Sequence, residues 1–526
     1  MTEVITPSGG SGSAVQEAAP PAGRLADQAL GLPSVLFCIV TGAAPLTAML
    51  FNVPVAVQGG GYAAPAAFLI ATVALTIFSV GYIAMSRRVT SAGGFYTFIS
   101  RGLGRIVGAG AGLLIGLCYI IFVAAVVGVL GYFAATSVQT WTGITLPAWL
   151  YMVVALAVMS ALAWFHIELT AKVLGVMLVA EVLALLVLSV SVLAHGGAEG
   201  LSVAPFNPAE VFGNAGAIKV FGAAASGVAL FAAFWSWVGF EMAPNYAEES
   251  RDPHRIAKIA TYGSVIGLGL FYMFCSYAYV SGWGLEASVK AVSDQFSGAF
   301  ASAFYPLSDR FVGHWLTTVI ELLAVTSSFA CALAFYNTGA RYLFALGREG
   351  VLPPVLARTS RRASPAVASM TVTVIVALYG LGFVLYDSST EGALLKLGTW
   401  SPLLGVLGIL AVQALVCVAI IRYFLTTARD GFNWFSTLVA PIIGGAAMVG
   451  ACWLLVANRA TLAGAADVPF ITLLPWVVAA MFVAGTVIAV VMRTRNPARY
   501  AGLGHFTLAD PELDRVEVHM PKHAAN

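Results

Sequence analysis

Charge is scarce in this sequence. Only 10% of its 526 residues are Asp, Glu, Lys or Arg, whereas 60% are hydrophobic. Soluble globular chains carry about 25% charged residues, so the composition argues against a soluble protein and for a membrane protein. The small net charge of +2 gives no argument for nucleic-acid binding.

Motifs of metal-dependent and nucleophilic enzymes are also missing. The sequence contains no HExxH, GxSxG or CxxC pattern, which favours transport over catalysis within the membrane. Its six cysteines lie at scattered positions in apolar segments, where core packing is expected in place of disulfides or metal ligation. These are Cys38, Cys118, Cys275, Cys331, Cys417 and Cys452. We therefore expect no cofactor and no firm metal site.

Long apolar stretches are abundant. A helix needs roughly 20 apolar residues to cross a bilayer, and about twelve stretches meet this length. The expected fold class is an all-α polytopic membrane protein. The predicted spans are residues 33–57, 64–86, 107–137, 147–165, 169–194, 218–246, 257–282, 312–346, 366–386, 394–425, 434–457 and 470–492.

Positive charge is distributed unevenly between the connecting loops. If both termini are cytoplasmic, all but five of the 26 Lys and Arg residues fall on the cytoplasmic side, as the positive-inside rule requires. We expect a multi-pass protein of the cell membrane with this orientation. Residues 1–30 are rich in Gly, Ser, Pro and Ala and are predicted to form a disordered cytoplasmic tail, not a cleavable signal. Residues 31–495 form the expected membrane domain, and 496–526 a second cytoplasmic tail.

Two predicted spans contain residues that a lipid-buried helix avoids. The sixth, "FWSWVGFEMAPNYAEESRDP" (234–253), places Gly239, Glu241 and Pro244 within six positions, and the first, "CIVTGAAPLTAML" (38–50), contains Gly42 and Pro45. A helix break inside the hydrocarbon layer leaves backbone N–H and C=O groups without hydrogen-bond partners, so it is tolerated mainly where it lines a site. Transporters built from inverted repeats place such breaks in corresponding helices of the two halves. An ordinary proline kink is the alternative.

Four stretches resemble the amino acid–polyamine–organocation (APC) superfamily of secondary transporters. They are "TGAAPLTA" (41–48), "RRVTSAGGFYTFISRGLGR" (87–105), "FWSWVGFEMAPNYAEESRDPHR" (234–255) and "NTGARYLFALGREGVLPP" (337–354). The resemblance implies the LeuT-type fold, with two inverted five-helix repeats and two peripheral helices. The repeats would cover residues about 31–195 and 215–427, and the peripheral helices 434–492.

The resemblance also implies a substrate site at the two breaks. Family members commonly bind the substrate carboxylate on amides of the first helix and its amine on carbonyls of the sixth, as helix dipoles favour. The implied substrate-binding residues are Thr41, Gly42, Ala43, Ala44, Pro45, Trp235, Trp237, Val238, Gly239 and Glu241. Trp235 aligns with an aromatic gate, for which packing or an anchor at the membrane interface is the alternative role.

The first break departs from the family pattern. The usual Gly-x-Gly reads Gly42-Ala43-Ala44 here and is followed by Pro45. Ala44 adds a Cβ where the backbone must approach a ligand, and Pro45 removes one N–H. An amine that lacks a carboxylate is therefore a second possible substrate.

Coupling residues are expected among buried polar groups. Glu181, in "GVMLVAEVLALLVL" (175–188), aligns with a lysine that many proton-coupled or exchanging relatives carry, and some relatives use the position of Glu241 as a proton sensor. Thr326 and Ser327 stand where sodium-coupled members coordinate the ion. The alternative role of these two hydroxyls is hydrogen bonding to the helix backbone, and that of Glu241 is capping of the backbone freed by the break. Proton coupling through Glu181 or Glu241, sodium coupling through Thr326 and Ser327, and exchange without an ion thus remain open.

The sequence as a whole predicts a permease that imports a small amino acid or related amine by alternating access, with a proton or sodium ion as its partner. An exchanger of amino acids or polyamines and a non-transporting substrate sensor are alternatives, and a channel is disfavoured because no rings of charge line a pore. Further residues have expected roles. Glu248 and Glu249 are expected in a gate with Arg87 or Arg88 or in a solvated surface, and Glu321 in the outer vestibule or in a pair with a neighbour. Arg341 is expected in the scaffold, and Tyr119 and Trp400 or Ser401 in the cavity wall.

Overall fold

The computed structural model of the chain describes residues 32–89, 93–163, 167–213, 226–242, 253–298, 301–360, 364–464 and 468–504. Over these ranges all regular structure is helical, and no strand is formed. Nine helical stretches in the same ranges are long and apolar enough to cross a membrane. The predicted fold class, an all-α polytopic membrane protein, is confirmed.

The helix bounds follow the predicted spans. Helices α3 (Ala64–Ser86) and α15 (Ala366–Tyr386) have the predicted limits. Three features reconcile nine stretches with about twelve predicted spans. The first stretch, Val35–Ser86, contains two of them; α6 (Ala148–Leu162) has only 15 residues; and the sixth span is described only over 226–242. Other long helices are α5 (Arg105–Thr142), α7 (Ile167–Ala194), α11 (Pro253–Trp283), α14 (His314–Arg348), α17 (Gly398–Thr426), α18 (Ala440–Ala457) and α20 (Pro469–Arg495).

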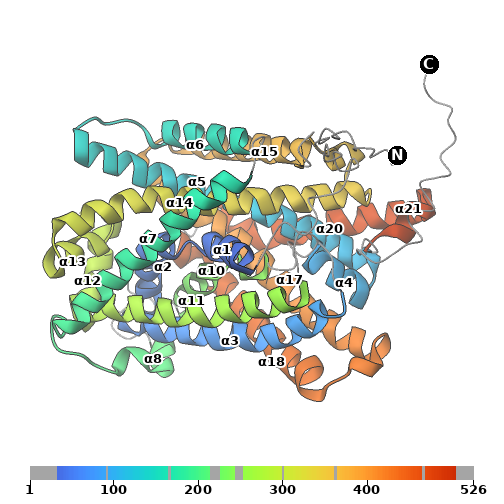
Figure 1. Ribbon diagram of the computed structural model, residues 1–526, viewed down its shortest axis with the longest axis horizontal. Coiled ribbons are helices and arrows are strands. Elements are labelled where there is room, and N and C mark those ends of the chain that lie inside the picture. Colours follow the sequence, from blue (N-terminus) through green and yellow to red (C-terminus); the bar gives the residue numbers. More distant parts are fainter. Residues whose placement is uncertain are drawn as a thin grey trace, which may run out of the picture.

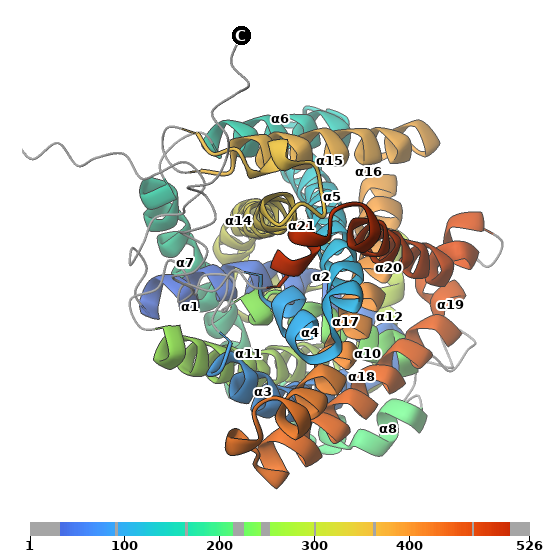
Figure 2. The same cartoon turned by 90° about the vertical axis from the view of Figure 1, so that its right-hand side faces the viewer.

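The long helices run along a common direction (Figure 1). The short helices α4 (Phe95–Leu103) and α21 (Pro497–Gly502) lie at one end of the bundle, and α8 (Pro208–Gly213), α12 (Leu285–Phe296) and α13 (Phe304–Phe311) lie at the other. Viewed from the end, α5 lies inside the bundle, whereas α6, α15, α18 and α20 lie at its rim (Figure 2). The most apolar window of α5 is 94% buried and that of α20 only 22%. The rim helices therefore present apolar side chains outward, as contact with lipid requires.

The first predicted span is broken. Helix α1 (Leu32–Ala43) ends where Ala44 adopts φ 41° and ψ 72°, and α2 (Pro45–Gly60) begins at the next residue. Ala44 is the only non-glycine residue with positive φ in the described ranges. Proline suits the first position of a helix, because its missing N–H would have no partner there. The sequence thus separates the two helices with a left-handed residue followed by a proline.

The sixth predicted span is interrupted as well. Helix α10 (Ser226–Ser236) ends at Ser236, and the chain continues to Met242 in tight turns in which N–H groups donate to the third carbonyl before them, as Trp237 does to Phe234 at 3.2 Å. Gly239 has φ 118°, which is accessible to glycine and strained for other residues. Proline 244 lies outside the described residues.

The end of the bundle that carries α4 also holds the last described residues of the chain. Glu349, directly after α14, is 8% exposed and accepts hydrogen bonds from the Gly504 N–H at 2.9 Å and from the Tyr96 hydroxyl. The Arg105 Nε donates to the Leu503 carbonyl at 3.3 Å. Leu503 and Gly504, which belong to the predicted tail, are therefore packed on the bundle by α4, α5 and α14.

Candidate functional site

The two helix breaks touch each other in the middle of the bundle. A Cβ atom built on Gly239 would lie 3.3 Å from the carbonyl carbon of Gly42, and one built on Gly42 would lie 3.8 Å from the Gly239 Cα. Helices α2 and α10 pack side by side next to this contact. Two break residues that are 197 positions apart are thus brought together by the fold, backbone against backbone.

Neighbouring helices supply donors for the carbonyls that the breaks release. The Tyr272 hydroxyl of α11 lies 3.2 Å from the Ala43 carbonyl oxygen and 3.1 Å from that of Ser236. The Cys331 thiol of α14 donates to the Gly42 carbonyl at 3.1 Å. These contacts offset the cost of desolvating the helix ends, whose carbonyl groups would otherwise lack hydrogen-bond partners inside the bundle.

Glu181 lies at the first break. Its side chain, 3% exposed on α7, accepts hydrogen bonds at Oε2 from the Leu46 N–H at 3.1 Å and from the Ser327 hydroxyl at 2.5 Å. Leu46 is the second residue of α2, so this carboxylate caps the N-terminus of the broken helix, where negative charge is favoured. The predicted coupling residues Glu181 and Ser327 are therefore in direct contact.

Glu241 lies at the second break and is also 3% exposed. One carboxylate oxygen accepts the Tyr119 hydroxyl of α5 at 2.7 Å, and the other accepts the Gly239 N–H at 3.0 Å. The Tyr82 hydroxyl of α3 donates to the Glu241 carbonyl at 2.8 Å. Two helices, α3 and α5, thus hold this segment, and the predicted wall residue Tyr119 is one of the contacts.

The hydroxyls predicted for sodium face different surroundings. Ser327 donates to Glu181, whereas the Thr326 hydroxyl donates to the Leu323 carbonyl of its own helix at 3.2 Å. At the next position of each helix, after Leu46 and Ser327, the hydroxyls of Thr47 and Ser328 lie 3.1 Å apart. Among the described residues, no group of three or more His, Cys, Asp or Glu side chains is placed to hold a metal ion.

The aromatic residues of the sixth span divide into two environments. Trp235, 8% exposed, meets Phe51 of α2 edge to face with ring centroids 5.4 Å apart. Trp237 is fully buried, and its indole N–H donates to the Val265 carbonyl of α11 at 3.2 Å. Val238, the residue after Trp237, is also buried. Trp235 faces the α2 side of the break and Trp237 faces α11.

Two buried polar atoms beside the breaks have no hydrogen-bond partner among the residues that the structure describes. They are the Thr41 hydroxyl oxygen and the Asn52 Oδ1, on side chains that are each 4% exposed. The Asn52 Nδ2 donates to the Ser236 hydroxyl at 2.8 Å, and Ser236 in turn donates to the Ala232 carbonyl at 2.9 Å. Unpaired buried polar atoms are rare and costly, and they are expected where a ligand or water completes the site.

Other predicted residues lie away from the breaks. The Trp400 indole donates to the Ala463 carbonyl at 3.0 Å and its ring stacks on Phe470, so it points toward α19 (Arg459–Ala463) and α20 and does not line the break. The hydroxyls of Ser401 and Tyr379 lie 3.0 Å apart. Glu321 accepts the Trp141 indole N–H at 2.8 Å, one of the two roles expected for it.

The predicted gate is described only in part. Arg88 forms an ion pair with Asp430 at 2.8 Å, whereas Glu248 and Glu249 lie outside the described residues. Arg341 is part of the α14 helix, as the scaffold role requires.

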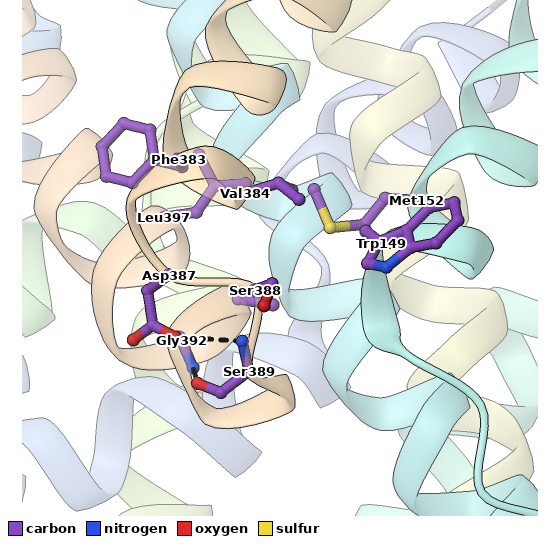
Figure 3. A pocket seen from close by; sticks show the side chains of 10 residues that line it. Trp149, Met152, Phe383, Val384, Asp387, Ser388, Ser389, Gly392 and Leu397 are labelled. Carbon is purple, nitrogen blue, oxygen red and sulfur yellow. Dashed lines mark hydrogen bonds between the residues drawn. The ribbon is translucent and has the colours of Figure 1, made fainter.

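A separate pocket opens between α6, α15 and the turn that follows α15 (Figure 3). Trp149, Met152 and Phe383 supply apolar wall, and Asp387 forms an ion pair with Lys396 at 2.6 Å. The hydrogen bond from Lys396 lowers the pKa of Asp387 to about 2. This pocket shares no residue with the helix breaks, and its only charged lining residue is already paired.

Several site residues were not predicted from the sequence. Asn52 and Cys331 are polar residues inside apolar spans, a signal that could have identified them. Tyr82 and Tyr272 gave no such signal, because tyrosine is common in membrane helices and their contacts at the breaks depend on the fold.

Comparison with known proteins adds to this geometry. The sequence profile of the family described as "Amino acid permease" matches residues 30–500. The D-serine/D-alanine/glycine transporter of Escherichia coli K12 is 28% identical over 174 residues, which is 33% of this chain and 34% of that protein. The branched-chain amino acid permease BcaP of Lactococcus lactis is 23% identical over 369 residues, 64% of this chain and 72% of the relative. The low-affinity putrescine importer PlaP of Escherichia coli K12 is 24% identical over 299 residues, 55% and 60% respectively.

Proposed function

Because this chain belongs to the amino acid permease family, we propose that it imports a small amino acid or related amine across the cell membrane by alternating access. The observation that carries this proposal is the meeting of two helix breaks at Gly42 and Gly239. Helices that are already broken can tilt their halves separately, so a site between them can open to one side and then to the other. The names of the relatives support substrates of this class.

We further propose that a proton drives the transport and that Glu181 carries it. The Glu181 carboxylate joins α7, α14 and the N-terminus of α2 through Ser327 and Leu46. Uptake of a proton removes the charge that holds the helix end, so protonation and movement of α2 are linked. A buried ionisable group in a membrane helix is the usual carrier of such a proton.

The proposal is tested by uptake into proteoliposomes. The full-length protein is reconstituted and offered a panel of labelled amino acids and amines with a proton gradient, with a sodium gradient and with neither. We expect accumulation with the proton gradient. Accumulation only with sodium would replace the proton by a sodium ion near Thr326 and Ser327. Equal accumulation without any gradient but with internal substrate would identify an exchanger. Absence of uptake from folded protein would favour the substrate sensor.

Glu181→Gln tests the coupling residue itself. Glutamine keeps an oxygen that can accept from Leu46 and Ser327 but carries no exchangeable charge. We expect the variant to lose its response to the proton gradient while it still exchanges substrate. Glu391→Gln is the matched control, since Glu391 is exposed and far along the chain from both breaks. If Glu181→Gln responds to pH as the parent does, Glu181 does not carry the proton.

A further inference from the structure

At each of the two breaks one backbone N–H group already donates to a carboxylate of the chain itself. Pro45 has no N–H, and the next residue, Leu46, donates to Glu181 at 3.1 Å. At the other break the Gly239 N–H donates to Glu241 at 3.0 Å. A substrate carboxylate that sought these donors would have to displace a glutamate from each of them.

The charge at the breaks also opposes an anion. Among the described residues no Lys, Arg or His forms an ion pair with Glu181 or Glu241. Both side chains are buried at 3% exposure, so water screens their charge weakly. A second carboxylate placed beside either of them is repelled, whereas an ammonium group is attracted.

The unpaired polar atoms fit the same kind of ligand. The Asn52 Oδ1 can only accept a hydrogen bond, and the Thr41 hydroxyl can accept one. An ammonium group brings three N–H donors and no acceptor. If the Asn52 amide were turned over, its N–H would be the unpaired group, so the assignment rests on the Asn52 Nδ2 contact with Ser236.

On the basis of the proposed function, we infer that the substrate is a small organic cation, an amine without a carboxylate. Glu241 is its counter-ion at the second break. Glu181 occupies the N-terminus of α2 and thereby excludes substrates with a carboxylate. Asn52 and Thr41 accept hydrogen bonds from the ammonium group or from a second polar group of the substrate. In this proposal the two glutamates, Glu181 and Glu241, determine which class of substrate binds.

Decarboxylation pairs test this inference. Equilibrium binding to the purified full-length protein is measured for serine and ethanolamine, valine and isobutylamine, and ornithine and putrescine, with the methyl ester of each amino acid as a size control. In each pair of which a member binds, we expect the amine to bind at least about tenfold more tightly than the amino acid. The methyl ester should bind like the amine. Tighter binding of the amino acids would overturn the inference and leave the proposed transport intact. Absence of binding and uptake by every compound would overturn both.

Two variants locate the effect. Glu181→Gln removes the charge at α2, so we expect the preference for amine over amino acid to fall by about fivefold or more. Glu241→Gln removes the counter-ion, so we expect amine binding to weaken by about tenfold or more. Glu391→Gln should change neither quantity. If Glu241→Gln does not fold, Asn52→Leu provides the second measurement, since it removes the free acceptor and should weaken amine binding. An unchanged preference in Glu181→Gln, or unchanged amine binding in the other variants, would contradict the inference.

Discussion

Trp235 and Trp237 stand two positions apart in the sequence and have different neighbours. The Trp235 ring contacts Phe51 on the α2 side of the break. Trp237 is fully buried, and its indole N–H donates a hydrogen bond to the Val265 carbonyl. We expect Trp235→Ala to lower uptake per folded molecule by about tenfold, because it removes the aromatic cover of the site. Trp237→Ala should instead lower the free energy of unfolding by about 3–5 kcal/mol.

Uptake in proteoliposomes and thermal unfolding in detergent separate the two tryptophans. Each uptake rate is divided by the amount of monodisperse protein, so that loss of fold is not counted as loss of transport. Normal uptake by Trp235→Ala would remove its role as a gate and leave only packing.

At the residue scale, buried charged residues of the site could be identified from the sequence, whereas their hydrogen-bond partners could not. Glu181 and Glu241 could be selected because a carboxylate in an apolar span needs a reason. That Glu181 would cap α2 through Leu46 could not be predicted, since the contact joins residues 135 positions apart. The partners of Asn52 and Tyr272 depend on the fold in the same way.

At the scale of the element, the contact between the two breaks leaves no room for a side chain at Gly239. Its φ of 118° is strained for any other residue, and a Cβ would lie 3.3 Å from Gly42. We expect Gly239→Ala to reduce substrate binding and uptake by about tenfold or more, because the breaks must separate or the turn must change. Binding and uptake are measured with Gly267→Ala as the control.

Gly267 is a suitable control because it lies inside α11 and a Cβ there would meet no atom within 4 Å. Alanine favours the helix over glycine by about 1 kcal/mol, so this variant should fold and transport normally. Equal activity of the two variants would show that the close approach at Gly239 has no functional importance.

The bounds of whole helices could be predicted, and the geometry of their interruptions could not. Spans 64–86 and 366–386 end where composition changes, and the structure has the same limits. The left-handed Ala44 was not evident from sequence, because glycine is the usual residue in that conformation. The strain at this alanine costs about 1–2 kcal/mol, which the contacts of α2 with Glu181 help to offset.

At the scale of the whole molecule, Glu349 joins the end of α14 to α4 and to the last described residues. Burial raises the pKa of its carboxyl to about 7, although Tyr96, the Gly504 N–H, Arg348 and Arg101 act in the opposite direction. The folded protein therefore keeps a proton that the unfolded chain releases. The free energy of unfolding should fall as pH rises from about 4.5 to about 7, by up to about 3 kcal/mol, and this contribution should be constant above and below that range.

Thermal unfolding of the parent and of Glu349→Gln across pH 4 to 8 tests this expectation. Glutamine cannot ionise, so the difference between the two unfolding temperatures should change across the stated window, with the parent losing stability relative to the variant as pH rises. Parallel curves would show that Glu349 does not titrate differently in the folded and unfolded states. The sequence predicted only a tail beyond residue 495, because residues 496–504 contain no apolar run that would indicate contact with the bundle.

The position of the Cys331 thiol offers a way to measure how often the first break becomes accessible during transport. It lies 4% exposed at the first break, bonded to the Gly42 carbonyl, so a water-soluble maleimide can reach it only when α1 and α14 separate there. In a background whose other cysteines are replaced by serine or alanine, the labelling rate of this one sulfur atom would record how often the path to the centre of the molecule opens, from whichever side the reagent is added.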